Sequence, residues 1–445
     1  MKKFAIAALG GTLAGALLTT QVAGPMLAQE PSSVYEQLDL FGDVFERIRG
    51  QYVEDVDSQK LIEAAINGML TSLDPHSSYM SSDDFGDMQV QTKGEFGGLG
   101  IEVTQEEGVV KVVSPMDGTP AAEAGIMAGD FITQVNGESV MGLTLDEAVA
   151  LMRGPIGSEI VITVVREGVP DPFDVSIIRD TIKLTAVKSR VIGTTVVLRI
   201  TTFSEQTYPG LETELKKAVE EVGGIDKVSG FVVDLRNNPG GLLNQGILVA
   251  DAFLEKGEIV STRGRNAQDD ERFNAEPGDL AQGKPLVVLI NGGSASASEI
   301  VTGALQDHRR AIVVGTKSFG KGSVQTLIPI RGDGAMRLTT ARYYTPSGRS
   351  IQSLGVMPDI VVNQPLVDPA KAGTEEAAAA EAEKQRSEAD LRGAISNDSM
   401  TEDERALLEE ERARTEESAK LRDEDYQLAY AVDILRGLSV VAPKP

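Results

Sequence analysis

The sequence predicts an α+β protein that has an α/β core, a small β-rich module before the core, and helical segments near both ends. Three observations lead to this class. Apolar residues recur at helical spacing between residues 34 and 88 and again after residue 425. Between these ends, short strand-like runs fill residues 93–183. Strands then alternate with helices over residues 184–362, which is the pattern of a sheet covered by helices.

Residues 1–28 have the pattern of an export signal. Lys2 and Lys3 form a positively charged start, and residues 4–18 are apolar and mostly small. Cleavage could follow Gly24 or Ala28, but the uncharged stretch is also about long enough to span a bilayer. We therefore expect a cleaved signal peptide or a membrane anchor. Both imply an exported body, either periplasmic or held at the inner membrane.

Residues 34–88 are expected to form an N-terminal helical region of two amphipathic helices. Apolar residues such as Phe41, Ile48 and Leu61 lie on their stripes. The second helix should end near Pro75, because the residue before a proline is disfavoured in a helix. Neither helix can bury its stripe alone, so the region should pack on the body or on a second subunit. A second subunit in this role would make the protein a homo-oligomer.

The β-rich module of residues 93–183 begins with a glycine-rich turn, residues 95–101, that runs into a strand. The N–H groups of such a turn can bind a terminal carboxylate, and the strand edge beyond it can add a peptide as an extra strand. An ordinary hairpin turn is the simpler alternative. The expected strands are 109–113, 131–135 and 160–166, and the expected short helices are 120–124 and 145–152.

The α/β core of residues 184–362 is followed by two further segments. Residues 363–424 are rich in Ala, Glu and Arg and should form an acidic linker, either a solvated helix or disordered. Residues 425–445 should form a helix anchored by the body or by a partner chain. The expected core strands are 195–201, 230–235, 285–290 and 311–314, and the expected helices are 210–222, 242–254 and 295–306.

Composition excludes several function classes. The formal charge of −25 argues against nucleic acid as a partner, because phosphate binding needs clustered Lys and Arg. The absence of cysteine removes disulfides, Cys-ligated zinc and a Cys nucleophile. His76 and His308 are the only histidines, and neither has a neighbourhood that favours a Ser-His-Asp triad. We expect no metal and no cofactor.

Three serines, Ser294, Ser296 and Ser298, stand between an apolar strand and a helix. A serine at a helix start lies beside unpaired N–H groups and the positive end of the helix dipole, which can stabilise an oxyanion. The alternative needs no catalysis, since Ser296 and Glu299 also fit an S-x-x-E capping box. The residues alone do not choose among the three serines.

A glycine-rich segment, residues 315–323, offers a base. Glycines flank Lys321 but not Lys317. A lysine can deprotonate a serine only if its pKa falls from about 10.4 toward the working pH, which burial can cause. A solvated loop cation is the simpler alternative for either lysine. A phosphate loop is not expected, because Gly322 stands where Ser or Thr is required and a strand follows.

A third segment, residues 234–241, follows another apolar strand and ends in two glycines. Gly240 and Gly241 can present N–H groups in conformations that other residues avoid. An ordinary strand-to-helix turn is again the simpler alternative, so the meaning of this segment depends on the other two.

Taken together, these motifs resemble known families. Residues 96–102 (FGGLGIE), 120–130 (PAAEAGIMAGD) and 135–137 (VNG) resemble a PDZ domain. Residues 235–241 (LRNNPGG), 294–299 (SASASE), 319–325 (FGKGSVQ) and 344–349 (YTPSGR) resemble the carboxy-terminal processing peptidases, or tail-specific proteases. The match runs in order over about residues 34–362.

The resemblance implies a crotonase-like core and a serine peptidase that uses a Ser/Lys pair. It selects Ser296 as the nucleophile and Lys321 as the base, with Gln325 orienting the lysine. The implied oxyanion hole consists of Ala297 and a glycine, Gly240 or Gly241.

The resemblance also implies that the PDZ-like domain holds the substrate's C-terminal end. Arg166, at the end of an expected strand, would link peptide occupancy to the catalytic site, although a simple exposed arginine remains the alternative. The residues implied to hold the terminal carboxylate are Gly98, Leu99, Gly100 and Ile101.

The expected function is that of an exported endopeptidase that processes or degrades envelope proteins, with or without an adaptor protein. Two other classes stay open. A PDZ scaffold with a silent peptidase domain would usually lack Ser296 or Lys321, and both are present. An acyl-thioester enzyme with the same core fold is disfavoured by the export signal, because such coenzymes are expected inside the cell.

Overall fold

A computed structural model describes residues 34–106, 108–116, 118–330, 334–364, 402 and 418–441. The expected signal or anchor segment and most of the expected acidic linker lie outside these residues. The chain divides into two compact units, residues 1–75 and residues 76–445. Within the described ranges, no helix combines the length and the apolar character that crossing a bilayer requires.

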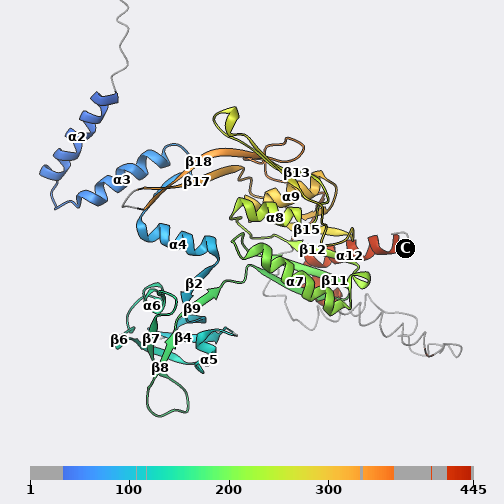
Figure 1. Cartoon of the computed structure of the whole chain (residues 1–445), viewed down its shortest axis with the longest axis horizontal. Helices are drawn as coiled ribbons and strands as arrows, with labels where there is room; N and C mark the ends of the chain where they lie inside the picture. Colours follow the sequence, from blue (N-terminus) through green and yellow to red (C-terminus); the bar gives the residue numbers. More distant parts are fainter. Residues whose placement is uncertain are drawn as a thin grey trace, which may run out of the picture. The chain divides into compact units, whose positions relative to one another are not determined.

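The first unit contains two helices, α2 (Val34–Gln51) and α3 (Ser58–Thr71), as expected from the spacing of apolar residues (Figure 1). Asp57 caps α3, because its carboxylate accepts the N–H groups of Gln59 and Lys60. No residue of α2 is buried. Its apolar side chains are therefore exposed, including Val34, Tyr35, Leu38, Phe41 and Val44.

The region that follows differs from the expected all-helical segment. A short strand, β1 (Ser78–Met80), precedes the helix α4 (Ser82–Lys93). β1 pairs with a strand far along the chain, with Ser78 opposite Arg337. A strand of three residues is too short to show a two-residue period, so its tertiary pairing, not its sequence, defines it.

The β-rich module has its own hydrophobic core, centred on residues such as Ile132, Ile160 and Ile162. Its strands pair in the order β3-β4-β5-β7-β8, with β6 added to β5. The two expected helices are α5 (Pro120–Glu123) and α6 (Leu145–Met152). The strands are β3 (Ile101–Glu106), β4 (Val109–Pro115), β5 (Phe131–Val135), β6 (Glu138–Ser139), β7 (Glu159–Val165) and β8 (Phe173–Ile178).

Two further strands connect the module to the rest of its unit. β2 (Glu95–Gly98) leads into the module and β9 (Asp180–Lys183) leads out of it. They pair antiparallel, from Glu95 opposite Lys183 to Gly98 opposite Asp180. The chain therefore enters and leaves the module through one two-stranded ribbon.

The core contains a six-stranded sheet in the order β10-β11-β12-β15-β16-β19, in which all pairs from β11 to β19 are parallel. The four expected core strands correspond to β11, β12, β15 and β16. The strands are β10 (Val187–Ile192), β11 (Thr195–Ile200), β12 (Gly230–Asp234), β15 (Leu286–Ile290), β16 (Ile312–Gly315) and β19 (Ile360–Val361).

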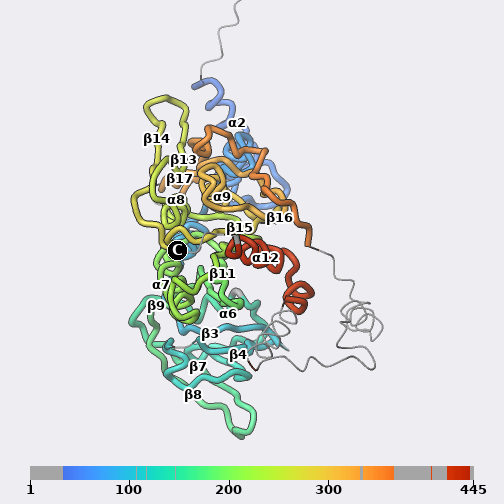
Figure 2. Tube along the Cα trace, turned by 90° about the vertical axis from the view of Figure 1, so that its right-hand side faces the viewer, coloured from blue at the N-terminus to red at the C-terminus, as the bar shows by residue number. Residues whose placement is uncertain are grey.

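Helices cover both faces of this sheet, and successive strand residues alternate between them. Leu198 and Val233 pack with α7, α8 and α9, whereas Val197 and Val232 pack with α12. Figure 2 shows α12 beside β15 and β16. The helices are α7 (Thr207–Val222), α8 (Leu243–Asp251), α9 (Ala297–Asp307) and α12 (Tyr426–Val441), with short 3-10 turns at Ile225–Lys227 and Ala267–Asp269.

A second sheet, in the order β1-β18-β13-β14 with β17 added to β18, was largely missed by the sequence analysis. Only the strand character of residues 324–328 was expected. Two of its strands, at residues 323–329 and 335–344, mix apolar and polar residues on half-exposed faces, which weakens the periodic signal. They are β13 (Gly257–Arg263), β14 (Glu271–Ala275), β17 (Ser323–Pro329) and β18 (Ala335–Tyr344).

The C-terminal helix α12 is anchored by an ion pair to the core sheet. Arg236, just after β12, contacts Asp425 through two hydrogen bonds of 2.7 Å and also pairs with Asp234. Burial alone would raise the pKa of Asp425, but the hydrogen bonds and charge of Arg236 outweigh it and hold that pKa below its usual value. The expected anchor on the body is therefore present.

Removing the charge of Asp425 should destabilise the fold. The change Asp425→Asn leaves Arg236 with one carboxylate partner instead of two, and we expect a loss of about 1–3 kcal/mol in the free energy of unfolding by urea at pH 7. Because the folded-state pKa of Asp425 is lowered, this difference should shrink as the pH falls below about 3.9. Asp433→Asn breaks an exposed pair with Arg422 and should cost less than about 1 kcal/mol. Equal losses in both variants would contradict the anchor.

Candidate active site

Three loops that follow the parallel strands β12, β15 and β16 meet at one edge of the core sheet. They carry the glycine pair, the serine cluster and the glycine-flanked lysine. In open parallel sheets, ligand sites form at the carboxyl ends of the strands. The fold thus brings together the three segments that the sequence analysis treated separately.

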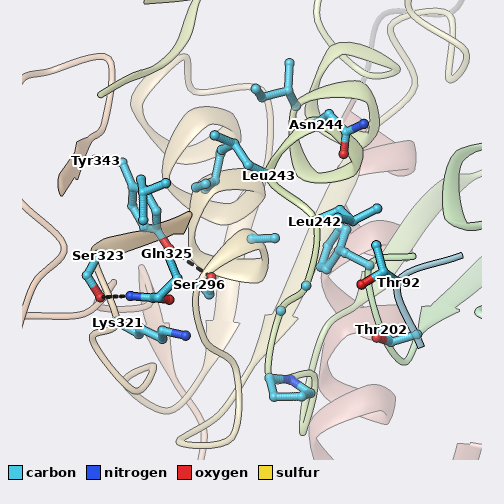
Figure 3. Close-up of a pocket in the computed structure, with 18 of the residues that line it drawn as sticks. Thr92, Thr202, Leu242, Leu243, Asn244, Ser296, Lys321, Ser323, Gln325 and Tyr343 are labelled. Atoms are coloured by element: carbon cyan, nitrogen blue, oxygen red, sulfur yellow. Dashed lines mark hydrogen bonds between the residues drawn. The ribbon is translucent and has the colours of Figure 1, made fainter. Parts of the chain in front are cut away.

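The three serines of the cluster have different surroundings. Ser294 and Ser298 are fully buried, and their hydroxyls donate to the main-chain carbonyls of Leu235 and Asn238 at 2.8 and 2.9 Å. Ser296 is partly exposed and lines a cavity. Its Oγ lies 2.8 Å from the hydroxyl oxygen of Tyr343 (Figure 3). Geometry therefore singles out Ser296, independently of the family resemblance.

The backbone of Ser296 is strained. Its φ of 57° and ψ of −116° lie in a region that residues with side chains rarely adopt. The strain turns the chain sharply between β15 and α9, and it leaves the N–H of Ala297 at the start of α9. In the described part of the chain, that N–H donates to no backbone carbonyl.

Gly240 and Gly241 lie against this turn in conformations that only glycine adopts easily, with φ of 99° and 142°. A Cβ on Gly240 would lie 2.6 Å from the Cβ of Ser296, and one on Gly241 would overlap the carbonyl of Phe203. Both glycines line the cavity beside Ser296. The N–H of Gly240 donates to the side chain of Asn238 at 2.9 Å. The N–H of Gly240, one of the implied oxyanion donors, therefore already has an acceptor in this structure.

Lys321 lines the same cavity and is partly buried. Burial, together with the positive charge of Arg337, holds the pKa of Lys321 below its ordinary value. A lowered pKa is the property that a lysine base requires. Lys317, the competing candidate, is exposed and does not line the cavity.

Gln325 lines the cavity as well, but its side chain points to other partners. Its amide nitrogen donates to the Ser323 hydroxyl at 2.9 Å and to the Thr339 hydroxyl at 3.3 Å (Figure 3). In the described residues, no hydrogen bond joins Gln325 to Lys321. The implied orientation of the lysine by Gln325 would need a different rotamer of one of the two side chains.

The sequence analysis missed the role of Glu299, which it considered only as part of a capping box. Its fully buried carboxylate accepts four hydrogen bonds, from the N–H groups of Ser296, Gly320 and Lys321 and from the Ser318 hydroxyl, at 2.5–2.9 Å. One side chain thus ties the serine turn to the lysine loop. The S-x-x-E spacing was the available signal, but it indicates only a helix cap. The donors that the Glu299 carboxylate accepts from the lysine loop lie about 20 residues further along the chain.

The cavity has a volume of about 730 Å³. Its wall is mostly apolar, with polar groups around Ser296, which is typical of a ligand-binding or active site. Neither histidine lines it, and the His308 ring contacts the carbonyl of Glu258 instead. Within the described ranges, no cluster of His, Asp or Glu is arranged to hold a metal ion.

The β-rich module has a second, smaller cavity between its glycine-rich turn and α6. All four residues implied to bind a carboxylate line it: Gly98, Leu99, Gly100 and Ile101. Among the described residues, the N–H groups of Leu99 and Gly100 donate to no backbone carbonyl. The rest of the wall is apolar, from Val103, Val149 and Met152, and Arg153 lies at its edge over the ring of Phe96. Sequence reasoning had not selected Arg153.

Arg166 lies just after β7 and is bound within its own module. Its guanidinium forms two hydrogen bonds of 2.7 Å with the buried carboxylate of Asp130 and one of 2.8 Å with the carbonyl of Gly125. It also lies over the ring of Phe173. Arg166 is thus neither a free exposed arginine nor, in this structure, a contact of the catalytic cavity.

Comparison with known proteins assigns this arrangement to a family. Residues 194–362 match the model of peptidase family S41, residues 111–166 match a PDZ domain, and residues 14–84 match the N-terminal domain of the activating protease CtpB. A carboxy-terminal-processing protease of Bartonella bacilliformis is 58% identical over 357 residues, which are 80% of this chain and 82% of the relative. The chain belongs to the carboxy-terminal-processing protease family.

Two further similar proteins share less of the sequence. The carboxy-terminal processing protease CtpA of Bacillus subtilis is 35% identical over 82% of this chain and 78% of its own length. Among solved structures, a photosystem II D1 C-terminal processing protease is 28% identical and aligns with 74% of this chain and 94% of its own, with a TM-score of 0.42. As a carboxy-terminal-processing protease, the present chain is a serine-type peptidase that carries a PDZ domain.

Neutralising Glu299 should impair this protease more than it unfolds it. In Glu299→Gln, an NH₂ group would face some of the donors that the carboxylate now accepts, so the serine turn and the lysine loop lose their common partner. We expect kcat/KM for a peptide substrate to fall by about 10- to 100-fold, and the free energy of unfolding by about 1–3 kcal/mol.

The matched control is Glu212→Gln, on the exposed face of α7, where the Tyr208 hydroxyl is the one hydrogen-bond partner of the carboxylate among the residues that the structure describes. Its kinetic constants should equal those of the wild type. A Glu299→Gln protein with unchanged kcat/KM would show that the lysine loop is held by other contacts.

Proposed function

We propose that this carboxy-terminal-processing protease is exported and cleaves envelope proteins with a Ser296/Lys321 dyad, after its PDZ domain has bound their C-terminal end. The observation that carries the proposal is the meeting of Ser296 and Lys321 in one cavity, with their main chains bound to a single carboxylate. No other serine of the cluster faces that cavity, and no histidine lines it.

The proposed chemistry begins with a neutral lysine. Lys321 takes the proton of Ser296 while Oγ attacks the scissile carbonyl, and the resulting ammonium then protonates the leaving amine. In the second half of the reaction, Lys321 takes a proton from water while the water oxygen attacks the acyl carbonyl. The ammonium then returns the proton to Ser296 Oγ as the acyl bond breaks. The developing oxyanion is bound by the N–H of Ala297 and by a glycine N–H, that of Gly241 or, once it leaves Asn238, that of Gly240. Gln325 orients Lys321 after exchanging its present partners.

Substrate selection is proposed to lie in the PDZ groove. The turn at Gly98, Leu99, Gly100 and Ile101 binds the terminal carboxylate, with the N–H groups of Leu99 and Gly100 as the available donors. The strand edge beyond the turn adds the substrate tail as a strand. The apolar wall favours a small or aliphatic last residue. A substrate whose terminal carboxylate is amidated should therefore show a raised KM with little change in kcat.

Arg166 is proposed to link occupancy of the groove to turnover. Because it is now paired with Asp130, such a role requires that it release this carboxylate when a peptide binds. Arg166→Ala should then lower kcat while the KM for a C-terminal peptide stays the same. If kcat is unchanged, the ion pair of Arg166 with Asp130 has only a structural role.

Assembly and location complete the proposal. The exposed apolar face of α2 supports a homo-oligomer, which light scattering at micromolar concentration would test.

The N-terminal pattern supports export to the periplasm, with residues 1–28 either cleaved or kept as an inner-membrane anchor. Sequencing the N-terminus of the mature protein distinguishes these two outcomes. We further propose a crotonase-like fold for the core and leave open whether an adaptor protein delivers substrates.

The central test is removal of either dyad member. Ser296→Ala and Lys321→Ala should each reduce the cleavage of a protein substrate to background without loss of the fold. The double variant should be no worse than either single variant, because residues that act as one unit are strongly non-additive. Substrate cleavage at the wild-type rate by Lys321→Ala would refute the dyad. Chelators and thiol reagents should have no effect.

The pH profile tests the role of Lys321 as a base. Activity should rise with pH as Lys321 loses its proton, with a midpoint below the ordinary lysine pKa of about 10.4. Arg337→Gln removes a positive charge that helps to lower this pKa, so the midpoint should move to higher pH and activity at neutral pH should fall. Lys317→Gln changes an exposed cation outside the cavity and should leave the midpoint in place. If the pH midpoint of activity is the same in Arg337→Gln as in the wild type, Lys321 is not the group whose deprotonation controls activity.

A further inference from the structure

The nucleophile has a second partner that belongs to neither the dyad nor the oxyanion hole. Tyr343, near the end of β18, directs its hydroxyl to Ser296, with 2.8 Å between the two oxygens (Figure 3). Its side chain lines the cavity but is only 3% exposed. The residue is 47 positions from Ser296 in the chain. The pairing of β18 with β13, which sets Tyr343 opposite Thr262, holds it there.

Proton counting indicates which oxygen donates. A serine and a tyrosine hydroxyl each have one proton, and buried hydroxyl donors are nearly always paired. Among the described residues, the Tyr343 hydroxyl has Ser296 Oγ as its single hydrogen-bond partner. If Ser296 donated to Tyr343, the buried tyrosine proton would lack an acceptor there. If Tyr343 donates, the serine proton stays available for a base.

The charge environment keeps Tyr343 a donor. Burial raises the pKa of its hydroxyl, the charge of Glu299 raises it further, and only the hydrogen bond with Ser296 acts in the opposite sense. The phenol therefore keeps its proton throughout the working range of the enzyme. It cannot itself accept the serine proton as a base.

We infer that Tyr343 is a positioning residue for the nucleophile: its hydroxyl donates to one lone pair of Ser296 Oγ, so that the serine proton turns toward Lys321 and the other lone pair toward the substrate carbonyl. The hydrogen bond also strengthens as negative charge develops on Oγ, since bonds to charged acceptors are about twice as strong as neutral ones. The inference rests on the proposed role of Ser296 and Lys321.

The main chain of Tyr343 supports this role. Its N–H donates to the carbonyl of Gly322 at 3.0 Å, and Gly322 directly follows Lys321. One residue of β18 thus contacts the serine through its side chain and the lysine loop through its backbone. Glu299 joins the same two segments through the main-chain N–H groups of Ser296 and Lys321. The serine turn and the lysine loop are thus held together by two residues, Tyr343 and Glu299.

The test uses Tyr343→Phe, which removes the hydroxyl and keeps the ring. We expect kcat for a peptide substrate to fall by about 10- to 100-fold with KM unchanged, which is the range for a lost hydrogen bond to a developing charge. Labelling of Ser296 by a fluorophosphonate, which needs no peptide binding, should slow by the same factor. The pH midpoint should not move, because Lys321 keeps its surroundings.

Tyr344→Phe is the matched control. This neighbour lies over the guanidinium of Arg263 and does not line the cavity, so its loss of a hydroxyl should leave kcat and the labelling rate at wild-type values. Labelling of Tyr343→Phe at the wild-type rate would overturn the inference. Faster labelling would overturn it too, because it would mean that the tyrosine restrains the serine.

A stability measurement keeps the inference testable if Tyr343→Phe proves inactive for a structural reason. In Ser296→Ala the buried tyrosine hydroxyl loses its acceptor, so adding Tyr343→Phe should raise the melting temperature of that variant. A further fall would contradict donation from Tyr343 to Ser296.

The labelling series also separates this inference from the proposed dyad. Failure of the fluorophosphonate to label wild-type Ser296, or labelling of Lys321→Ala at the wild-type rate, would remove the dyad itself. A wild-type protein that labels at Ser296 and a Lys321→Ala protein that does not would leave the dyad intact, and the Tyr343→Phe rate then decides the role of the tyrosine alone.

Discussion

The proposed catalytic arrangement of Ser296 and Lys321 depends on one buried carboxylate. Glu299 lies on α9, where it accepts the N–H of Ser296, and it also accepts three donors from the loop that carries Lys321. A buried carboxylate is costly unless donors surround it, so the lysine loop cannot leave without a large penalty. The carboxylate binds the main chain of Lys321 and not its ammonium group. This matters because a direct ion pair would raise the pKa of the lysine and keep it protonated.

The parallel sheet provides the frame for this contact. The loops after β12, β15 and β16 end at one edge, and each contributes a different part: the glycines, the proposed nucleophile Ser296 and the proposed base Lys321. The second sheet closes the site from the other side, since β17 and β18 supply Gln325, Arg337 and Tyr343. The turn that carries Ser296 thus follows a strand of the first sheet, whereas Tyr343, whose hydroxyl contacts the Ser296 hydroxyl, lies on a strand of the second sheet.

The sequence predicted the parts of the structure that have strong local signals. Helices and buried strands of the parallel sheet have clear apolar patterns, and the motifs around Ser296 and Lys321 were recognisable from their glycines and small residues. Contacts between distant segments had no such signal. Glu299 has the spacing of a helix cap, and only the folded chain brings the lysine loop onto its carboxylate. Tyr343 lies on β18, whose half-polar pattern concealed the strand itself. The engagement of Gln325 with Ser323, two residues away on β17, could not be foreseen either, because a sequence pattern does not specify a side-chain rotamer.

The ribbon formed by β2 and β9 has a mechanical consequence. A domain on a single flexible strand rotates freely, whereas two paired strands resist twisting because their cross-strand hydrogen bonds would have to deform. If the module holds a substrate tail as proposed, this attachment would limit the directions in which the tail leaves the module, and so favour some lengths of tail over others at the cavity. The spacing between the bound chain end and the scissile bond would then contribute to cleavage-site selection, alongside the residues around that bond.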